Sequence, residues 1–226
     1  MGKIIIQEET IKNPISLIGK EAGVCWNGKD DTEHNYKRGL DCIKSNHGRT
    51  LEFPQIFFIL DGYSARAIRE FYTHNGGLPT RLQSSTRYID YEHGFEFVTP
   101  PSIENNERAK IIYETRMEEI TDDMRVLLEM GIPREDCAMM LPLAMTTKVV
   151  DRTNLRQLID MSRQRMCSRA YWEFRNLMND LLKALADYSD EWNTLVNEIK
   201  VFKPKCVDYG YCTEAKSCGR MPRKDD

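Results

Sequence analysis

The segment "THNGGLPTRLQSSTRYIDY", residues 73–91, gathers residue types that hold an anion. Glycines let backbone N–H groups approach a ligand, while hydroxyl and guanidinium groups add hydrogen-bond donors. Here Gly76–Gly77 precede Arg81, a run of three hydroxyls at 84–86, and Arg87. Such a cradle suits phosphate better than carboxylate. The same composition is also typical of a surface turn whose arginines face water. No Gly-Lys-Ser/Thr follows the glycines, so this is neither a Walker loop nor a dinucleotide fingerprint.

The bulk composition narrows the class of protein. The chain has 226 residues, 41% hydrophobic and 30% charged, which is typical of a globular protein. Its net charge of −3 argues against a generic polyanion binder, so we expect no nucleic-acid partner. We also expect no membrane contact, because no apolar stretch reaches the length of a span and the start lacks a signal-peptide pattern. Seven cysteines at irregular spacing favour a reducing compartment, and we expect a cytoplasmic protein.

Hydrophobic patterning predicts the elements that hold this segment. Residues 3–9 and 53–63 have the character of strands, and the nearly continuous apolar run of the second suggests burial on both faces. A helix over 64–74, with Ser64 as its N-cap, leads into the segment. The strand over 91–101 is expected at an edge of the sheet, since prolines stop it.

Helical periodicity predicts the rest of the chain. Short helices are expected over 13–26 and 34–48, with Gly48 as the C-cap of the second. A long helix over 102–130 precedes a loop and strand over 138–150, and a second long helix covers 154–185. The simplest organisation is one mixed α/β (α+β) domain over residues 1–200, followed by a cysteine-bearing tail at 201–226.

The second half of the chain carries a more specific pattern. Residues 131–175 contain "PRED" before "LPL", Asn-x-Arg at 154–156, an arginine nine positions later (Arg165), and then "WE". This order resembles the flavin-dependent thymidylate synthases. "SSTRY" then matches the Ser-x-Arg-Tyr that ends the signature of that family. The resemblance spans roughly residues 15–185.

The resemblance implies a fold and an activity. Members of the family methylate dUMP at C5 to give dTMP, using FAD, NADPH and methylenetetrahydrofolate. Their fold has a central, mostly antiparallel sheet flanked by long helices. They are homotetramers that build each flavin site from several chains.

It also implies a set of site residues. Arg165 is the expected catalytic residue and meets the pyrimidine. The expected nucleotide-binding residues are Arg165, Glu70, Arg81, Gln83, Ser84, Ser85, Thr86 and Arg87. The expected flavin-binding residues are Thr73, His74, Asn75, Asn154, Arg156 and Asp160.

The chemistry of the reaction supports an arginine at position 165. Uracil C5 is a weak nucleophile, so electron density must be drawn toward it before it attacks an electrophilic carbon. A guanidinium bonded to a pyrimidine oxygen stabilises the enolate-like form, because it stays charged and presents two donors in one plane. The flavin carries the redox chemistry, so we expect no cysteine nucleophile. Four of the cysteines are interpreted as core or helix thiols: Cys25, Cys42, Cys137 and Cys167.

Helix geometry separates two of the expected site residues. Arg156 and Asp160 share a helix face, whereas Arg165 lies nine residues beyond Arg156, about 900° around a straight helix. Several interpretations remain open. The helix breaks, or its two faces serve different active sites across a subunit interface. A third is that Arg165 only forms a surface salt bridge.

The chain departs from the family in the first part of the signature. Where Arg-His-Arg is usual, it has Thr73-His74-Asn75, and the loop before Ser85 is two residues longer. Phe53 replaces a common histidine and Ala138 replaces an expected phosphate-binding arginine. We hypothesise that Arg81 supplies the charge missing at Ala138. His74 is the retained signature residue, or a histidine that faces the end of a helix dipole.

These departures keep two alternatives open. One is a variant flavin enzyme that modifies C5 of another pyrimidine nucleotide or releases a hydroxymethyl product. The other is a non-catalytic flavin- or nucleotide-binding relative.

Three tail cysteines, Cys206, Cys212 and Cys218, are spaced evenly by six. They could ligate zinc with a fourth ligand from elsewhere, but the tight pairs of a zinc ribbon are missing. Free or docking thiols are the other reading, and we expect no metal.

Overall fold

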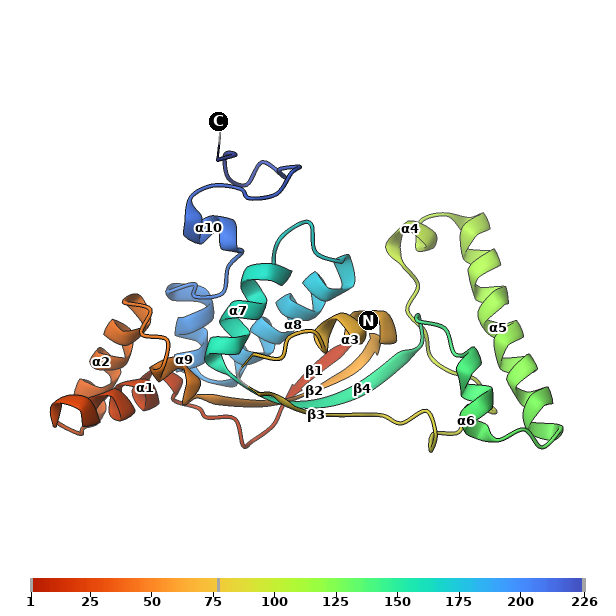
Figure 1. Cartoon of the computed structure of the whole chain (residues 1–226), viewed down its shortest axis with the longest axis horizontal. Coiled ribbons are helices and arrows are strands. Elements are labelled where there is room, and N and C mark those ends of the chain that lie inside the picture. The colour runs from red at the N-terminus through yellow and green to blue at the C-terminus, as the bar shows by residue number, and fades with distance from the viewer. Residues whose placement is uncertain (1, 77, 225–226) are drawn as a thin grey trace. The chain divides into compact units, whose positions relative to one another are not determined.

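The structure is a computed structural model that describes residues 2–76 and 78–224. Four strands form one antiparallel sheet with the order β1-β2-β4-β3 (Figure 1). They are β1 (Lys3–Ile6), β2 (Gln55–Ser64), β3 (Thr80–Gln83) and β4 (Thr146–Asn154). The expected mixed α/β class with a mostly antiparallel sheet is therefore confirmed. The first strand is shorter than predicted, since it ends at Ile6.

Strand β2 follows from its sequence, although its burial differs from the prediction. Ile56, Phe58 and Leu60 are fully buried, whereas the residues between them are only partly buried. The strand therefore has one buried face rather than two, because alternate side chains of a strand point to opposite sides. Ser64 ends β2 and caps the following helix α3 (Ala65–Phe71), as predicted: its Oγ accepts a hydrogen bond from the backbone N–H of Ala67 at 3.1 Å.

The described chain divides into two compact units, which we treat separately. Unit 1 comprises residues 1–3, 60–72 and 82–150, and unit 2 comprises residues 4–59, 73–81 and 151–226. The proposed boundary between a domain over 1–200 and a tail stays a prediction.

Unit 1 contains helices α3, α4 (Pro101–Glu104), α5 (Glu107–Glu129) and α6 (Arg134–Cys137), and the turn η3 (Ala138–Met140). Its core cluster is Tyr91, Met124 and Met145. The helix predicted over 102–130 is interrupted, because the side chain of Asn106 caps α5 by accepting from the N–H of Ala109 at 3.1 Å. The strand predicted over 91–101 is wrong: it is reduced to a single bridge between Phe97 and Met145.

Unit 2 contains the remaining helical elements. They are α1 (Pro14–Gly23), η1 (Val24–Trp26), α2 (Thr32–Lys44), η2 (Thr50–Glu52), α7 (Leu155–Arg165), α8 (Trp172–Tyr188), α9 (Asp190–Asn193), the π-helical turn η4 (Thr194–Glu198) and α10 (Lys205–Tyr209). Helices α1 and α2 lie side by side (Figure 1). A Cβ atom at Gly19 would overlap the carbonyl oxygen of Asn35, and one at Gly39 would overlap that of Ile15. The pair therefore depends on glycine at both positions.

Two predicted features of unit 2 are corrected. Helix α2 ends at Lys44 with Ser45 as its C-cap, so Gly48 is not the cap; a Cβ there would lie 3.2 Å from Cζ of Arg156. The helix predicted over 154–185 breaks after Arg165. The guanidinium of Arg175 donates to the carbonyl oxygens of Ser168 and Ala170, which compensates for hydrogen bonds that the break removes.

None of the helices described for this chain combines the length and the apolar character that a membrane span requires.

Candidate active site

The side chain of Arg165, the last residue of α7, is held from three sides within unit 2. Its Nε donates to Nε2 of His74 at 2.8 Å, and its Nη2 donates to Oγ1 of Thr73 at 3.3 Å. Its Cζ lies 4.7 Å from the centre of the Phe174 ring, a cation–π contact. The ring of His74 contacts the same phenyl ring, with 5.7 Å between centroids. The plane of the guanidinium is therefore fixed.

His74 accepts this hydrogen bond because it is neutral. Burial, together with the positive charges of Arg165 and Arg81, lowers the pKa of its imidazole to about 4. A neutral imidazole that accepts at Nε2 carries its proton on Nδ1. His74 is 9% exposed, so it is a buried acceptor rather than a surface histidine.

The backbone carbonyl oxygen of His74 is also held by two side chains. Nη2 of Arg81 donates to it at 2.8 Å, and Nε2 of Gln157 donates to it at 2.6 Å. Gln157 is buried and accepts in turn from Oγ1 of Thr153 at 2.6 Å. The position of His74, and through it that of Arg165, thus depends on residues of β3, β4 and α7.

Arg81 forms a buried ion pair with Asp151. Nε of Arg81 contacts Oδ2 of Asp151, and the two side chains are 5% and 0% exposed. Oδ1 of Asp151 is buried without a hydrogen-bond partner among the described residues. Burial raises the pKa of Asp151 to about 6, although Arg81 acts in the opposite direction. Because the charge of Arg81 is matched inside unit 2, the hypothesis that it replaces a missing phosphate ligand needs direct testing.

The three residues expected near the flavin on α7 have different surroundings. Asn154 caps the helix, since its Oδ1 accepts from the N–H of Gln157 at 2.9 Å. Nη1 of Arg156 contacts Oε1 of Glu52 at 2.6 Å, and its side chain is 49% exposed. Asp160 is exposed and pairs with Arg163 at 2.9 Å.

Arg156 and Arg165, near the two ends of α7, reach different parts of unit 2, as the helical angle requires. Arg156 lies beside Glu52 and Gly48, whereas Arg165 lies beside Thr73 and His74. The helix does break, but beyond Arg165, so the break does not separate the two. That their faces serve different active sites stays a prediction.

The expected nucleotide-binding residues 83–87 belong to unit 1: Gln83 is the last residue of β3, and residues 84–87 lie in the turn that follows it. Ser84 N–H donates to the carbonyl oxygen of Lys148 at 2.9 Å, and Nε2 of Gln83 donates to Oγ1 of Thr147 at 3.3 Å. Ser85 Oγ accepts from the N–H of Arg87 at 3.3 Å. The turn is thus closed by its own hydroxyl and backbone groups.

Arg87 pairs with Glu135 of α6 at 2.8 Å, and a second pair joins Arg134 to Asp90 at 3.0 Å. Both partners of the Arg87 pair are more than half exposed, so this contact contributes little stability and a ligand could displace it. Ala138, at the start of η3, has no charge to add, and Thr86 is partly buried.

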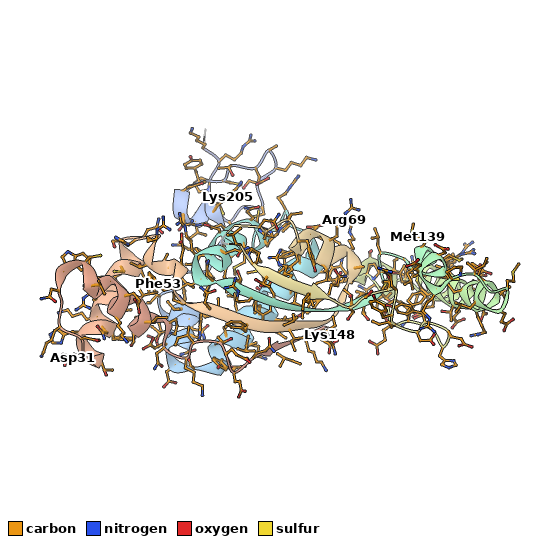
Figure 2. The ribbon with its side chains drawn as sticks, turned by 60° about the horizontal axis from the view of Figure 1, so that its bottom comes forward. Asp31, Phe53, Arg69, Met139, Lys148 and Lys205 are labelled. Atoms are coloured by element: carbon orange, nitrogen blue, oxygen red, sulfur yellow. The ribbon has the colours of Figure 1, made fainter. Side chains whose placement is uncertain are left out.

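The remaining expected residues are placed as follows. Glu70 lies on α3 and is partly buried, and Thr73 and Asn75 are exposed. Phe53, which stands where the family has a histidine, is 47% exposed; its side chain is labelled in Figure 2. Gly77 lies outside the described residues.

Sequence reasoning assigned no site role to Asp151, Gln157 or Phe174. One signal for Asp151 was available. It lies two residues from Val149 and two from Thr153 in β4, all three are buried, and a carboxylate on a buried face requires a partner. The partner itself, 70 positions away, has no local signal.

Comparison with known proteins decides the family. The model of the family described as thymidylate synthase complementing protein matches residues 7–188. The chain belongs to the flavin-dependent thymidylate synthase family. It is 30% identical to the flavin-dependent thymidylate synthase of Nitratidesulfovibrio vulgaris over 80% of this chain and 74% of that one. With the Pyrococcus furiosus protein of the same name it shares 30% identity over 90% and 86% of the chains.

Solved structures confirm the thymidylate synthase fold. The flavin-dependent thymidylate synthase of Helicobacter pylori, complexed with FAD and dUMP, superposes with a TM-score of 0.66 at 21% identity, over 84% of this chain and 97% of that one. The UMP/dUMP methylase PolB of Streptomyces cacaoi, bound with 5-Br dUMP, gives a TM-score of 0.70 at 16% identity, over 90% and 98%. The chain is thus an enzyme of this family, and its site residues remain expectations from sequence.

Proposed function

We propose that this enzyme converts dUMP to dTMP by FAD-dependent reductive methylation, with methylenetetrahydrofolate as carbon donor and NADPH as reductant. The observation that carries the proposal is the orientation of the Arg165 guanidinium by His74, Thr73 and Phe174. A guanidinium fixed in this way at the end of α7 suits a planar ligand with a carbonyl oxygen.

Arg165 acts on the electron distribution of the pyrimidine. By donating to a ring oxygen it stabilises the enolate-like form in which C5 is nucleophilic. Because His74 is neutral, it accepts from Nε and leaves the full positive charge on the arginine. A protonated histidine at that distance would instead repel the guanidinium.

Residues 83–87 bind the nucleotide in this proposal, with Arg87 and the neighbouring hydroxyls near its phosphate. The donor set fits this role, because exposed Arg87 can exchange Glu135 for a phosphate, the stronger bidentate partner. Glu70 is proposed to contribute to the same nucleotide site.

The residues expected to hold FAD also fit a dinucleotide. Arg156 is half exposed and, together with Thr73 and Asn75, offers cationic and hydrogen-bonding groups that suit phosphate and ribose. Asn154 and Asp160 flank this arginine on α7. A bound flavin supplies the electrons for the reductive step, and the protein orients it against the base. We propose a homotetramer in which several subunits build each flavin site.

The departures from the family signature favour a second candidate, a C5-modifying enzyme for another pyrimidine nucleotide. Thr73 and Asn75 replace signature arginines, and Ala138 replaces another. The structural similarity to a UMP/dUMP methylase shows that the fold serves a protein of that description.

A turnover assay tests the proposal and separates the candidates. Purified protein is incubated with dUMP, UMP or dCMP, each with and without NADPH and methylenetetrahydrofolate. We expect dTMP from dUMP only when both co-substrates are present. Turnover of UMP or dCMP but not dUMP, or a hydroxymethyl product, supports the second candidate. A flavin spectrum without any turnover contradicts both and supports a non-catalytic relative.

A further inference from the structure

Four of the seven cysteines meet around one small cavity of unit 2. The cavity measures about 10 Å³ and its lining includes Cys167, Cys206, Cys212 and Cys218. Cys167 lies in the break between α7 and α8, and the other three belong to the tail. All four are unpaired thiols in this structure. The interpretation of Cys167 as a core or helix thiol is therefore corrected, whereas Cys25 is an exposed thiol within the helical turn η1.

The tail that supplies three of these thiols has little apolar material to hold it. Between residues 201 and 224 only Phe202, Pro204, Cys206 and Cys212 are buried. The other ties to the rest of unit 2 are polar. Arg163 pairs with Asp208 at 3.0 Å, and Nη1 of Arg220 donates to the carbonyl oxygen of Met166 at 3.2 Å. Lys205, labelled in Figure 2, is the first residue of α10 within this tail. Segments with so small a core are usually held by a covalent or metal staple.

Cys218 has the surroundings of a reactive thiol. It is exposed, and hydrogen bonds from the Ser168 side chain and the Arg220 backbone N–H lower the pKa of its thiol. The lining of the cavity includes four cationic residues and one acidic residue: Arg169, Lys205, Lys216, Arg220 and Glu214. Such an electropositive environment favours the thiolate, the nucleophilic form of cysteine.

Cys218 forms a hydrogen bond with Ser168, and Ser168 directly follows Cys167 in the chain. This contact brings Cys218 close to Cys167. Cys167 is partly exposed, whereas Cys206 and Cys212 are 8% and 9% exposed. Among the three other thiols that line the cavity, Cys167 is thus the one best placed to react with Cys218.

We infer that Cys167 and Cys218 form a reversible disulfide that fastens the tail to the end of α7, two residues beyond Arg165. In the first step the Cys218 thiolate attacks a small disulfide such as oxidised glutathione and releases one glutathione thiolate. In the second step Cys167, after losing its proton to water, attacks the Cys218 sulfur and expels the second glutathione thiolate. The two cysteines are oxidised by two electrons, and two glutathione thiols are produced.

A disulfide fits better than a metal ion. No three His, Cys, Asp or Glu side chains within the described part of the chain have an arrangement that could hold a metal. The thiols line one cavity, but their positions along the sequence lack the closely spaced cysteine pairs that are typical of a zinc site.

Peptide mapping tests this pairing without using activity. Cleavage after Lys and Arg places Cys167 in peptide 166–169, Cys206 and Cys212 together in 206–216, and Cys218 in 217–220. Native protein is treated with oxidised glutathione, free thiols are blocked with N-ethylmaleimide at low pH, and the digest is analysed by mass spectrometry. We expect peptide 166–169 linked to 217–220, a loss of two free thiols per chain, and reversal by dithiothreitol. A link within 206–216, or no link at all, overturns the inference.

Single substitutions test the order of the steps. Cys167→Ser should accumulate glutathione on Cys218, whereas Cys218→Ser should yield neither the link nor an adduct on Cys167. Cys25→Ser, which removes an exposed thiol remote from this cavity in sequence, is the matched control and should still form the link. Near-UV circular dichroism confirms that each variant is folded. One zinc per chain in protein purified without chelator would also overturn the inference, because the thiols would then be ligands.

Discussion

The Nε atom of Arg165 donates a hydrogen bond to the Nε2 atom of His74 at 2.8 Å, although 91 positions separate the two residues. The contact joins the histidine expected to be the retained member of the family signature to the arginine expected to polarise the pyrimidine. It gives His74 a physical role: it is an uncharged acceptor that orients a cation. The stacked Phe174 ring then limits rotation of the guanidinium.

Replacing Arg165 by lysine should reduce turnover of dUMP by roughly 10²–10³-fold, the cost typical of losing one group that stabilises transition-state charge. Lysine keeps the charge but loses the planar pair of donors. Steady-state kinetics with saturating co-substrates measures the effect. The control is Arg163→Lys on the same helix, which should stay close to the natural protein. Near-normal activity of Arg165→Lys would remove Arg165 from the mechanism.

His74→Phe should lower turnover by about tenfold while the protein stays folded, because the ring contact remains and only the acceptor for Arg165 is lost. As a positioning residue, His74 should affect kcat more than KM for dUMP. His74→Gln, which retains an acceptor, should recover part of the activity. A smaller loss in His74→Phe than in His74→Gln would assign His74 a packing role instead.

Arg81→Ala should destabilise unit 2 by about 3–5 kcal/mol, because it leaves the carboxylate of Asp151 buried without its partner. Replacing both residues by leucine should cost less than this single change. Urea unfolding followed by tryptophan fluorescence reports on unit 2, which contains Trp26, Trp172 and Trp192. Because the guanidinium is buried, we expect the dUMP affinity of folded Arg81→Ala to be unchanged. A large loss of affinity would instead support Arg81 as the substitute for the missing phosphate ligand.

His74 and Asp151 should drive the pH dependence of unfolding in opposite directions. The pKa of His74 falls from 6.5 to about 4 on folding, so the unfolded chain binds more protons and stability rises with pH across that range. The pKa of Asp151 rises from 3.8 to about 6, so the folded chain binds more protons and stability falls with rising pH between those values. The two effects largely cancel between pH 4 and 6.

His74→Gln isolates one of the two contributions. The unfolding free energy of the natural protein minus that of this variant should increase between pH 4 and 6.5, by about 1 kcal/mol per pH unit. Urea unfolding at half-unit intervals measures it. A difference that is independent of pH would mean that His74 titrates normally in the folded protein.

Asn154→Ala should cost about 1 kcal/mol of stability, because Asn154 Oδ1 caps the N-terminus of α7. Asn154→Asp keeps the cap and should retain this stability. Flavin affinity gives a second readout: if Asn154 also contacts FAD, Asn154→Asp should weaken flavin binding although the helix is intact. Unchanged affinity in a stable Asn154→Asp variant would limit the residue to capping.

Local signals predicted much of the fold. The apolar run of β2, the Ser64 cap of α3 and the end of the helix predicted to reach residue 130 all depend on neighbouring residues. The structure has each of them, with α5 ending at Glu129. The helix breaks were missed for a related reason. Asn106 is an ordinary residue in a helical pattern until its side chain caps the next turn, and the bonds from Arg175 depend on the chain having already turned.

The candidate site was only half accessible from sequence. Family motifs pointed to Arg165 and His74, but their contact could not be read from a pattern, since one lies on a helix and the other in a loop. The Arg81–Asp151 pair required knowledge of which strand face is buried. The hypothesis that Arg81 supplies the charge missing at Ala138 was made without knowledge of its burial.

The crossing of α1 and α2 has a consequence beyond packing. A methyl group at Gly19 or Gly39 would collide with a main-chain oxygen of the opposing helix. We therefore expect selection to accept only synonymous codon changes at these two positions. A deep mutational scan should therefore find no tolerated substitution at either position, although neither residue is assigned to chemistry.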